Sequence, residues 1–186
     1  MRLAIILLAG GASILWAQGP GVEELERVAR TATVMVDGDI CQRIQTKRSL
    51  EFLMKQNPRD PWLASDNYDV EHENFLRTKK TLMRLARLCP HECDVNLWMP
   101  VAGQPGEIQV VIRNVYELSS FWKWGALHQP MPEPMRRVLE TGNVVTVHVR
   151  PGMTSVLAPV YNSLDEMVGL VEVVSQEKRD LQENVK

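Results

Sequence analysis

The chain has 186 residues, of which 45% are hydrophobic, and its formal net charge is −2 at pH 7. This length and composition suit one packed domain and exclude bulk disorder, which is typical of chains with few apolar residues. The slightly acidic balance also argues against nucleic acid as a partner, because nucleic-acid binding requires a basic face.

The N-terminus has the layout of a secretory signal peptide. Arg2 is positively charged, residues 3–17 are apolar or small, and Gln18-Gly19-Pro20 ends the run. The run is shorter than the about 20 apolar residues that a transmembrane helix needs. We therefore expect a signal peptide at residues 1–17 and a periplasmic or secreted protein. A membrane anchor formed by an uncleaved N-terminal segment is the alternative.

The N-terminal half carries apolar residues at helical spacing. Residues 22–36 predict an amphipathic helix, and residues 40–54 predict that it resumes after a break at Asp37-Gly38-Asp39. Residues 56–69 are rich in turn formers and predict a loop. Residues 70–88 predict the clearest helix, which ends at Cys89-Pro90 because the residue before a proline disfavours helix.

The C-terminal half is predicted to be mostly strand. Residues 94–101 and 107–115 alternate between apolar and polar side chains and predict two strands joined by a turn at 102–106. An aromatic connector leads to a short helix at 132–141, for which Gly142 is the expected C-terminal end. A strand at 144–149 and a final hairpin at 154–176 follow. Gly169 in that hairpin marks a position where a neighbouring backbone can approach closely.

The final hairpin combines APVYN at 158–162, a polar turn and VGLVEVV at 168–174. This pattern resembles the last hairpin of PAS-like extracytoplasmic sensor domains of the Cache type. The resemblance implies an α+β fold, with an antiparallel PAS-like sheet of about five strands and long N-terminal helices packed behind it. The expected organisation is a signal peptide (1–17), N-terminal helices and a loop (18–69), a sensor core on which the helix at 22–54 packs (70–176), and a charged tail (177–186).

The resemblance also implies a ligand site. In Cache-type proteins a small ligand lies between the concave face of the sheet and the connector that crosses it, which here is 115–131. An arginine in such a site would pair a carboxylate, aromatic side chains would form walls with polar tips, and histidines would sense pH or hydrogen-bond the ligand. The competing interpretation makes the tryptophans core residues and leaves the histidines solvated. The candidate ligand-binding residues are Arg113, Tyr116, Trp122, Trp124, His128, His148 and Tyr161.

The three cysteines, Cys41, Cys89 and Cys93, favour one disulfide and one free thiol in an exported chain. We predict a Cys89–Cys93 bond, and pairing of Cys41 with either is the alternative. A zinc site formed by Cys89, His91 and Cys93, with Cys41 as a fourth ligand, is a further alternative. Non-covalent haem is a weaker one, since the loop lacks the Cys-x-x-Cys-His motif. We predict no metal and no cofactor.

The chain carries no Gly-x-Ser-x-Gly elbow, no phosphate-binding glycine-rich loop and no His-Glu-x-x-His motif, so we predict a protein without catalytic residues. We expect an exported sensor domain that binds a small molecule and presents a ligand-dependent surface to a partner, such as a membrane-bound signalling protein. A second copy of the chain, paired through the N-terminal helix, is another expected partner. The alternatives are a structural or interaction protein with a filled PAS-like core, or a small haem, metal or redox protein that uses Cys89, His91 and Cys93.

Overall fold

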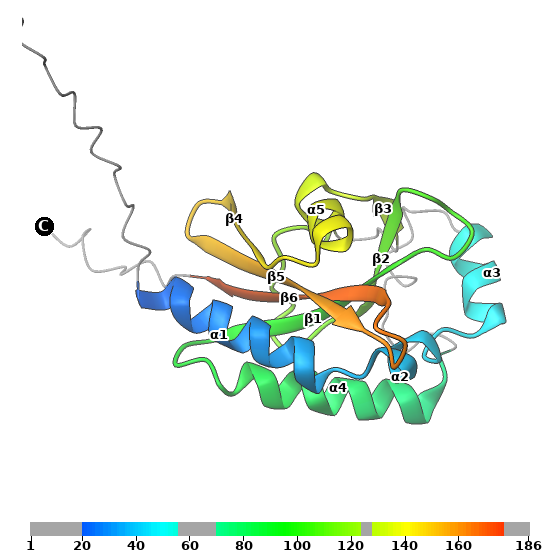
Figure 1. Cartoon of the computed structure of the whole chain (residues 1–186), viewed down its shortest axis with the longest axis horizontal. Coiled ribbons are helices and arrows are strands. Elements are labelled where there is room, and N and C mark those ends of the chain that lie inside the picture. Colours follow the sequence, from blue (N-terminus) through cyan, green and yellow to red (C-terminus); the bar gives the residue numbers. More distant parts are fainter. Residues whose placement is uncertain (1–19, 56–69, 124–127, 177–186) are drawn as a thin grey trace, which may run out of the picture.

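The computed structural model describes residues 20–55, 70–123 and 128–176, which form an α+β fold around a curled sheet (Figure 1). The sheet has six antiparallel strands in the order β3-β2-β1-β6-β5-β4. The strands are β1 (Cys93–Pro100), β2 (Glu107–Ile112), β3 (His128–Pro130), β4 (Val145–Arg150), β5 (Met153–Tyr161) and β6 (Met167–Gln176). The helices are α1 (Pro20–Met35), α2 (Gly38–Gln42), α3 (Lys47–Lys55), α4 (His72–Ala86) and α5 (Glu133–Thr141).

The predicted α+β class and the antiparallel sheet are confirmed. The sheet has one strand more than the sequence pattern predicts, because β3 of the connector pairs with β2 through Glu107 and Pro130. The predicted helix over 40–54 is instead two helices, α2 and α3. The break has a local cause: the Thr46 hydroxyl accepts a hydrogen bond from the Ser49 backbone N–H at 3.0 Å, which caps a new helix.

Helices cover the two faces of the sheet unequally. On the first face, α1 packs on β5 and β6 and α4 packs on β1, so that both helices lie on the same side of the sheet (Figure 1). The second face carries α5 and the connector, and a separate buried cluster forms there. The central strands β1, β5 and β6 are therefore buried on both faces, which explains their long apolar runs.

Strands β4, β5 and β6 are neighbours in the sheet, so the predicted final hairpin is confirmed. An ideal Cβ on Gly169 would lie 2.6 Å from the Trp98 carbonyl oxygen, so the predicted close approach is also confirmed. Helix α5 ends at Gly142, whose φ of 68° is the left-handed conformation that glycine favours.

The predicted signal peptide, the loop at 56–69 and the charged tail lie outside the described residues. Across 20–55, 70–123 and 128–176, the structure has no helix that is both long enough and apolar enough to cross a membrane.

Candidate functional site

Glu172 is the centre of the second face of the sheet. It lies in β6, is 0% exposed, and its carboxylate accepts hydrogen bonds from both the sheet and the connector. The donors are Trp98 Nε1 (3.0 Å), Ser119 Oγ (2.6 Å), the Ser120 backbone N–H (2.7 Å), Ser155 Oγ (2.8 Å) and, at 3.4 Å, Asn96 Nδ2. A buried carboxylate is tolerated when donors surround it in this way.

Asp94 and Asn96 extend this polar row along β1. The Asp94 carboxylate accepts the backbone N–H groups of Tyr116 (3.2 Å) and Leu118 (2.8 Å). The Asn96 amide donates to the Leu118 carbonyl at 2.7 Å and accepts from the Asn114 backbone N–H at 3.1 Å. Together with Glu172, these two side chains fix residues 114–120, which follow β2 and lead into the connector, to the sheet.

Burial determines the electrostatics of the row. It raises the pKa of Glu172 above the usual range of a glutamate, although the hydrogen bonds from Ser119, Ser120, Ser155 and Trp98 oppose the shift. Burial also raises the pKa of Asp94, against the opposing backbone hydrogen bonds from the connector. Both carboxyls therefore take up a proton more readily than exposed acids do.

Apolar side chains fill the second face beside Glu172. Three sheet residues, Trp98, Leu157 and Leu170, pack with the connector residue Phe121 and with α5 in one cluster whose members are all at most 8% exposed. At this part of the face, protein side chains take the place that the Cache resemblance assigns to a ligand.

The predicted ligand-binding residues are only partly brought together. Arg113 is buried, its guanidinium carbon lies 4.4 Å from the centre of the Trp122 ring, and it forms an ion pair with Glu117 at 3.3 Å. Tyr116 is exposed nearby in the connector. His128 lies on the edge strand β3, where its Nδ1 is 2.9 Å from a carboxylate oxygen of Glu107.

The remaining predicted residues lie elsewhere. His148 is exposed on β4, with its Nδ1 3.1 Å from the hydroxyl of Thr154 at the start of β5. Tyr161 is the last residue of β5, and its hydroxyl lies beside Gly142 after α5. Trp124 lies outside the described residues. Arg113 and Trp122 thus form a pair, whereas His148 and Tyr161 lie toward opposite ends of β5, and their ligand-binding role stays a prediction.

The predicted Cys89–Cys93 disulfide is confirmed, and the alternative pairing with Cys41 is wrong. Cys41 is a buried free thiol, and burial raises its pKa to about 12. A zinc site at Cys89, His91 and Cys93 requires thiolates, which the bond removes. No cluster of three or more histidine, cysteine or acidic side chains with metal-binding geometry occurs among the residues that the structure describes.

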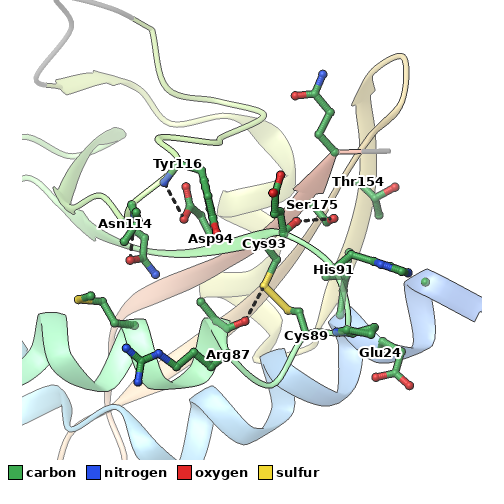
Figure 2. A pocket seen from close by; sticks show the side chains of 18 of the residues that line it. Glu24, Arg87, Cys89, His91, Cys93, Asp94, Asn114, Tyr116, Thr154 and Ser175 are labelled. Atoms are coloured by element: carbon green, nitrogen blue, oxygen red, sulfur yellow. Dashed lines mark hydrogen bonds between the residues drawn. A yellow bond between two sulfur atoms is a disulfide. The ribbon is translucent and has the colours of Figure 1, made fainter. Parts of the chain in front are cut away.

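A hollow of about 1140 Å³ lies beside the disulfide (Figure 2). We call it the disulfide hollow. Its walls come from the start of α1, the end of α4, the 89–92 loop, the first residues of β1, residues 114–116 of the connector, and the outer ends of β5 and β6. Its polar lining comprises Glu24, Arg87, His91, Glu92, Asp94, Asn114, Thr154, Ser175 and Gln176, and its apolar lining includes Val22, Leu25, Met83, Ala86, Val115 and Tyr116. Of the predicted ligand-binding residues, Tyr116 is among these lining residues.

Asn114 stands out in this lining. The residue is 6% exposed, its backbone N–H donates to Asn96, and its side-chain oxygen accepts the Val115 backbone N–H at 3.0 Å. Its Nδ2 is buried and has no hydrogen-bond partner in the described part of the chain. Most buried amide groups are hydrogen-bonded, so this donor is an exception that requires a reason.

Comparison of the chain with protein-family models, with curated proteins and with solved structures finds no match. Sequence reasoning missed the polar row and Asn114. A signal for Glu172 was present, since it is the lone charged residue in the apolar run VGLVEVV at 168–174. Asn114 carries no comparable signal, because its environment depends on how the connector folds back.

Proposed function

We propose that this chain is an exported, non-enzymatic ligand-binding domain of the PAS-like, Cache type, and that its ligand binds in the disulfide hollow. One observation carries the proposal: among the described residues, the second face is closed around Glu172, whereas the disulfide hollow is open and lined by both polar and apolar groups. Small-molecule sites are typically concavities of about 300–1,000 Å³ with mostly apolar walls and a few polar groups, and the hollow is of this order.

Two features support export. Residues 1–17 have the pattern of a signal peptide, and the Cys89–Cys93 disulfide is typical of proteins that fold in an oxidising compartment.

The contacts of the connector suggest how binding would reach a partner. Asp94 lines the hollow, and its carboxylate holds the backbone of Tyr116 and Leu118. The neighbouring side chains of Val115 and Tyr116 are 63% and 53% exposed. A ligand that contacts Asp94 would shift these exposed side chains, and a membrane-bound signalling protein that reads this surface would detect the change.

The test compares a blocked hollow with an unblocked one. Gly21 lines the hollow, and nothing lies within 4 Å of an ideal Cβ placed on it, so the Cβ of Gly21→Trp meets no atom and the indole is placed at the wall of the hollow to block it. Val149→Trp, at an exposed position on β4, is the matched control. Small amines, amides and acids are screened by thermal shift against the exported protein, because a ligand of the folded state raises its melting temperature. We expect a shift that Gly21→Trp abolishes and Val149→Trp retains. No shift with any class, or an equal shift in Gly21→Trp, would contradict the proposal.

A second candidate function is an interaction protein with a filled core. The closed packing around Glu172 favours it, as do Val34 and Met35, which are 83% and 59% exposed at the end of α1. Pairing of two chains through α1 would cover these side chains. Sedimentation equilibrium of the exported protein tests this candidate: a dimer that Val34→Glu dissociates supports it, and a monomer at all concentrations contradicts it.

A further inference from the structure

We propose that the disulfide hollow recognises a neutral or basic peptide-like ligand, one of whose carbonyl groups accepts a hydrogen bond from Asn114 Nδ2. This inference rests on the proposed function and adds the chemical class of the ligand. It starts from a group in the lining that lacks a partner.

The Asn114 side chain is oriented by its own contacts. Its side-chain oxygen accepts a hydrogen bond from the Val115 backbone N–H, which fixes the orientation of the amide group. In this orientation the Nδ2 group is a hydrogen-bond donor that has no acceptor in the described part of the chain. A buried donor without an acceptor costs about 1–3 kcal/mol. A ligand acceptor placed at the bottom of the hollow would remove this cost, which gives binding a specific driving force.

The neighbouring carboxylate does not serve as that acceptor. Figure 2 shows Asp94 next to Asn114 and Tyr116, and its two oxygens accept the N–H groups of Tyr116 and Leu118, whereas no hydrogen bond joins it to Asn114 Nδ2. Within the described chain, Asn114 Nδ2 is therefore a buried donor without a protein partner, on a residue that lines the hollow.

The charge of the residues that line the hollow favours a neutral acceptor group on the ligand over a carboxylate. Glu24, Glu92 and Asp94 are acidic, and Glu24 also forms an ion pair with Arg27 outside the lining, whereas Arg87 is the one permanently charged basic side chain among the residues that line the hollow. A carboxylate ligand would be repelled by these acids. A neutral carbonyl accepts the same hydrogen bond without this repulsion, and basic groups elsewhere on the ligand would be attracted to Glu24 and Glu92 at the rim.

The apolar lining accounts for the rest of the ligand. Val22, Leu25 and Met83 line the hollow together with Val115 and Tyr116, and they provide surface for aliphatic side chains. A chain that combines backbone carbonyls with apolar and basic side chains has all three properties. A short peptide with blocked ends is the simplest molecule of this kind.

The experiment titrates the exported protein with the tetrapeptide acetyl-Leu-Lys-Leu-Lys-amide, followed by NMR. The control ligand is acetyl-Leu-Glu-Leu-Glu-amide, which has the same backbone and the opposite charge. We expect the lysine peptide to bind at least about tenfold more tightly than the glutamate peptide, and the Asn114 side-chain N–H signals to move on binding, as they do when a free donor gains an acceptor.

Three variants test the residues that the inference names. Asn114→Asp keeps the size of the side chain and the oxygen that accepts the Val115 N–H, but it removes the Nδ2 donor. We therefore expect it to lower the affinity for the lysine peptide by about tenfold or more. Because a new buried carboxylate can also destabilise the fold, Asn114→Ala is measured as a second variant that lacks the donor. A double variant at the rim, Glu24→Gln with Glu92→Gln, tests the charge preference. The rim pair should lower the preference for the lysine peptide without changing the fold.

The outcomes separate this inference from the proposed function. Equal affinity for the two peptides, or unchanged binding in folded Asn114→Asp or Asn114→Ala, would overturn the ligand class. If neither peptide binds but a compound from the thermal-shift screen binds and is blocked by Gly21→Trp, the ligand class is wrong and the proposed function stands. If no compound and no peptide binds, both are overturned.

Discussion

The Trp98 indole N–H donates a hydrogen bond to the Glu172 carboxylate at 3.0 Å, and this bond joins β1 to β6 inside the second face of the sheet. The same carboxylate holds Ser119 and Ser120 of the connector. One acidic side chain therefore fixes both the pairing of two central strands and the segment that crosses them.

Glu172→Leu removes the shared acceptor while filling its volume. The indole, the Ser119 hydroxyl and the Ser120 N–H then lose their acceptor, while the Ser155 hydroxyl keeps Ser120 Oγ at 2.7 Å as a partner, and each unsatisfied buried donor costs about 1–3 kcal/mol. We expect the free energy of unfolding, measured in urea, to fall by at least about 3 kcal/mol. Exposed Glu140→Leu on α5 serves as the control and should change it little. An equal, small effect of both variants would show that the network contributes nothing to stability.

Glu172 also predicts a pH dependence. Burial raises its pKa above the usual value of about 4.5, so the folded protein binds this proton more readily than the unfolded chain does. The resulting stability is complete below about pH 4.5 and is lost as the pH rises toward the raised pKa. Glu172→Gln cannot titrate there. The stability of the native protein relative to this variant should therefore decrease with rising pH, by at most about 1.4 kcal/mol per pH unit. Asp94 is present in both proteins and cancels, so parallel stability curves would refute the assignment to Glu172.

Gly169→Ala tests the register of β1 against β6. A Cβ at this position would lie 2.6 Å from the Trp98 carbonyl oxygen, which is backbone and cannot move aside without shifting the strand. We expect a loss of stability of about 1–3 kcal/mol, as overpacking in a core produces. Gly21→Ala meets nothing within 4 Å and is the control for a glycine substitution as such. A neutral Gly169→Ala would mean that the two strands do not approach as described.

The disulfide should stabilise the fold without being essential to it. The bond closes a short loop between residues four positions apart, for which the loss of unfolded-state entropy corresponds to about 2 kcal/mol. Replacement of both Cys89 and Cys93 by serine should lower the free energy of unfolding by about this amount, and circular dichroism should show a folded protein. Reduction of the native protein should match the double variant. A stability unaffected by reduction would mean that the bond does not form.

Cys41 should be unreactive in the folded protein. It is buried, and burial raises its pKa to about 12, so almost no thiolate exists at pH 8. We expect no reaction with an aromatic disulfide reagent until denaturant is added, after which a single thiol per chain should react. Rapid labelling of the native protein would place Cys41 at the surface, and more than one thiol after denaturation would argue against the Cys89–Cys93 bond.

Local pattern was enough to predict much of the fold. Alternating side chains located β1 and β2, the helix pattern located α1 and α4, and the final hairpin with Gly169 appeared as expected. These features depend on residues close together in sequence, where helical and strand periodicity is directly visible. The edge strand β3 was not foreseen, because three residues in a connector carry too little periodicity to predict pairing with β2.

The site was harder to predict because it depends on contacts between distant segments. Asp94 and Asn114 line the same hollow only because the connector folds back over β1. The hydrogen-bond donors to Glu172 likewise come from three separate segments, β1, β5 and the connector. The candidates chosen from aromatic and ionisable residue types instead spread over the sheet, with His148 on β4 and His128 on β3. Residue type alone did not reveal which polar groups would be buried or left without a partner.

A map of backbone amide shifts in the exported protein, saturated with the lysine peptide or the best compound of the screen, locates the bound ligand on the fold. We predict the largest changes around the disulfide hollow, at 21–25, 86–94, 114–116 and 175–176. Changes concentrated instead on the second face, around Phe121, Leu157 and Leu170, would show that the ligand enters the core that we describe as filled.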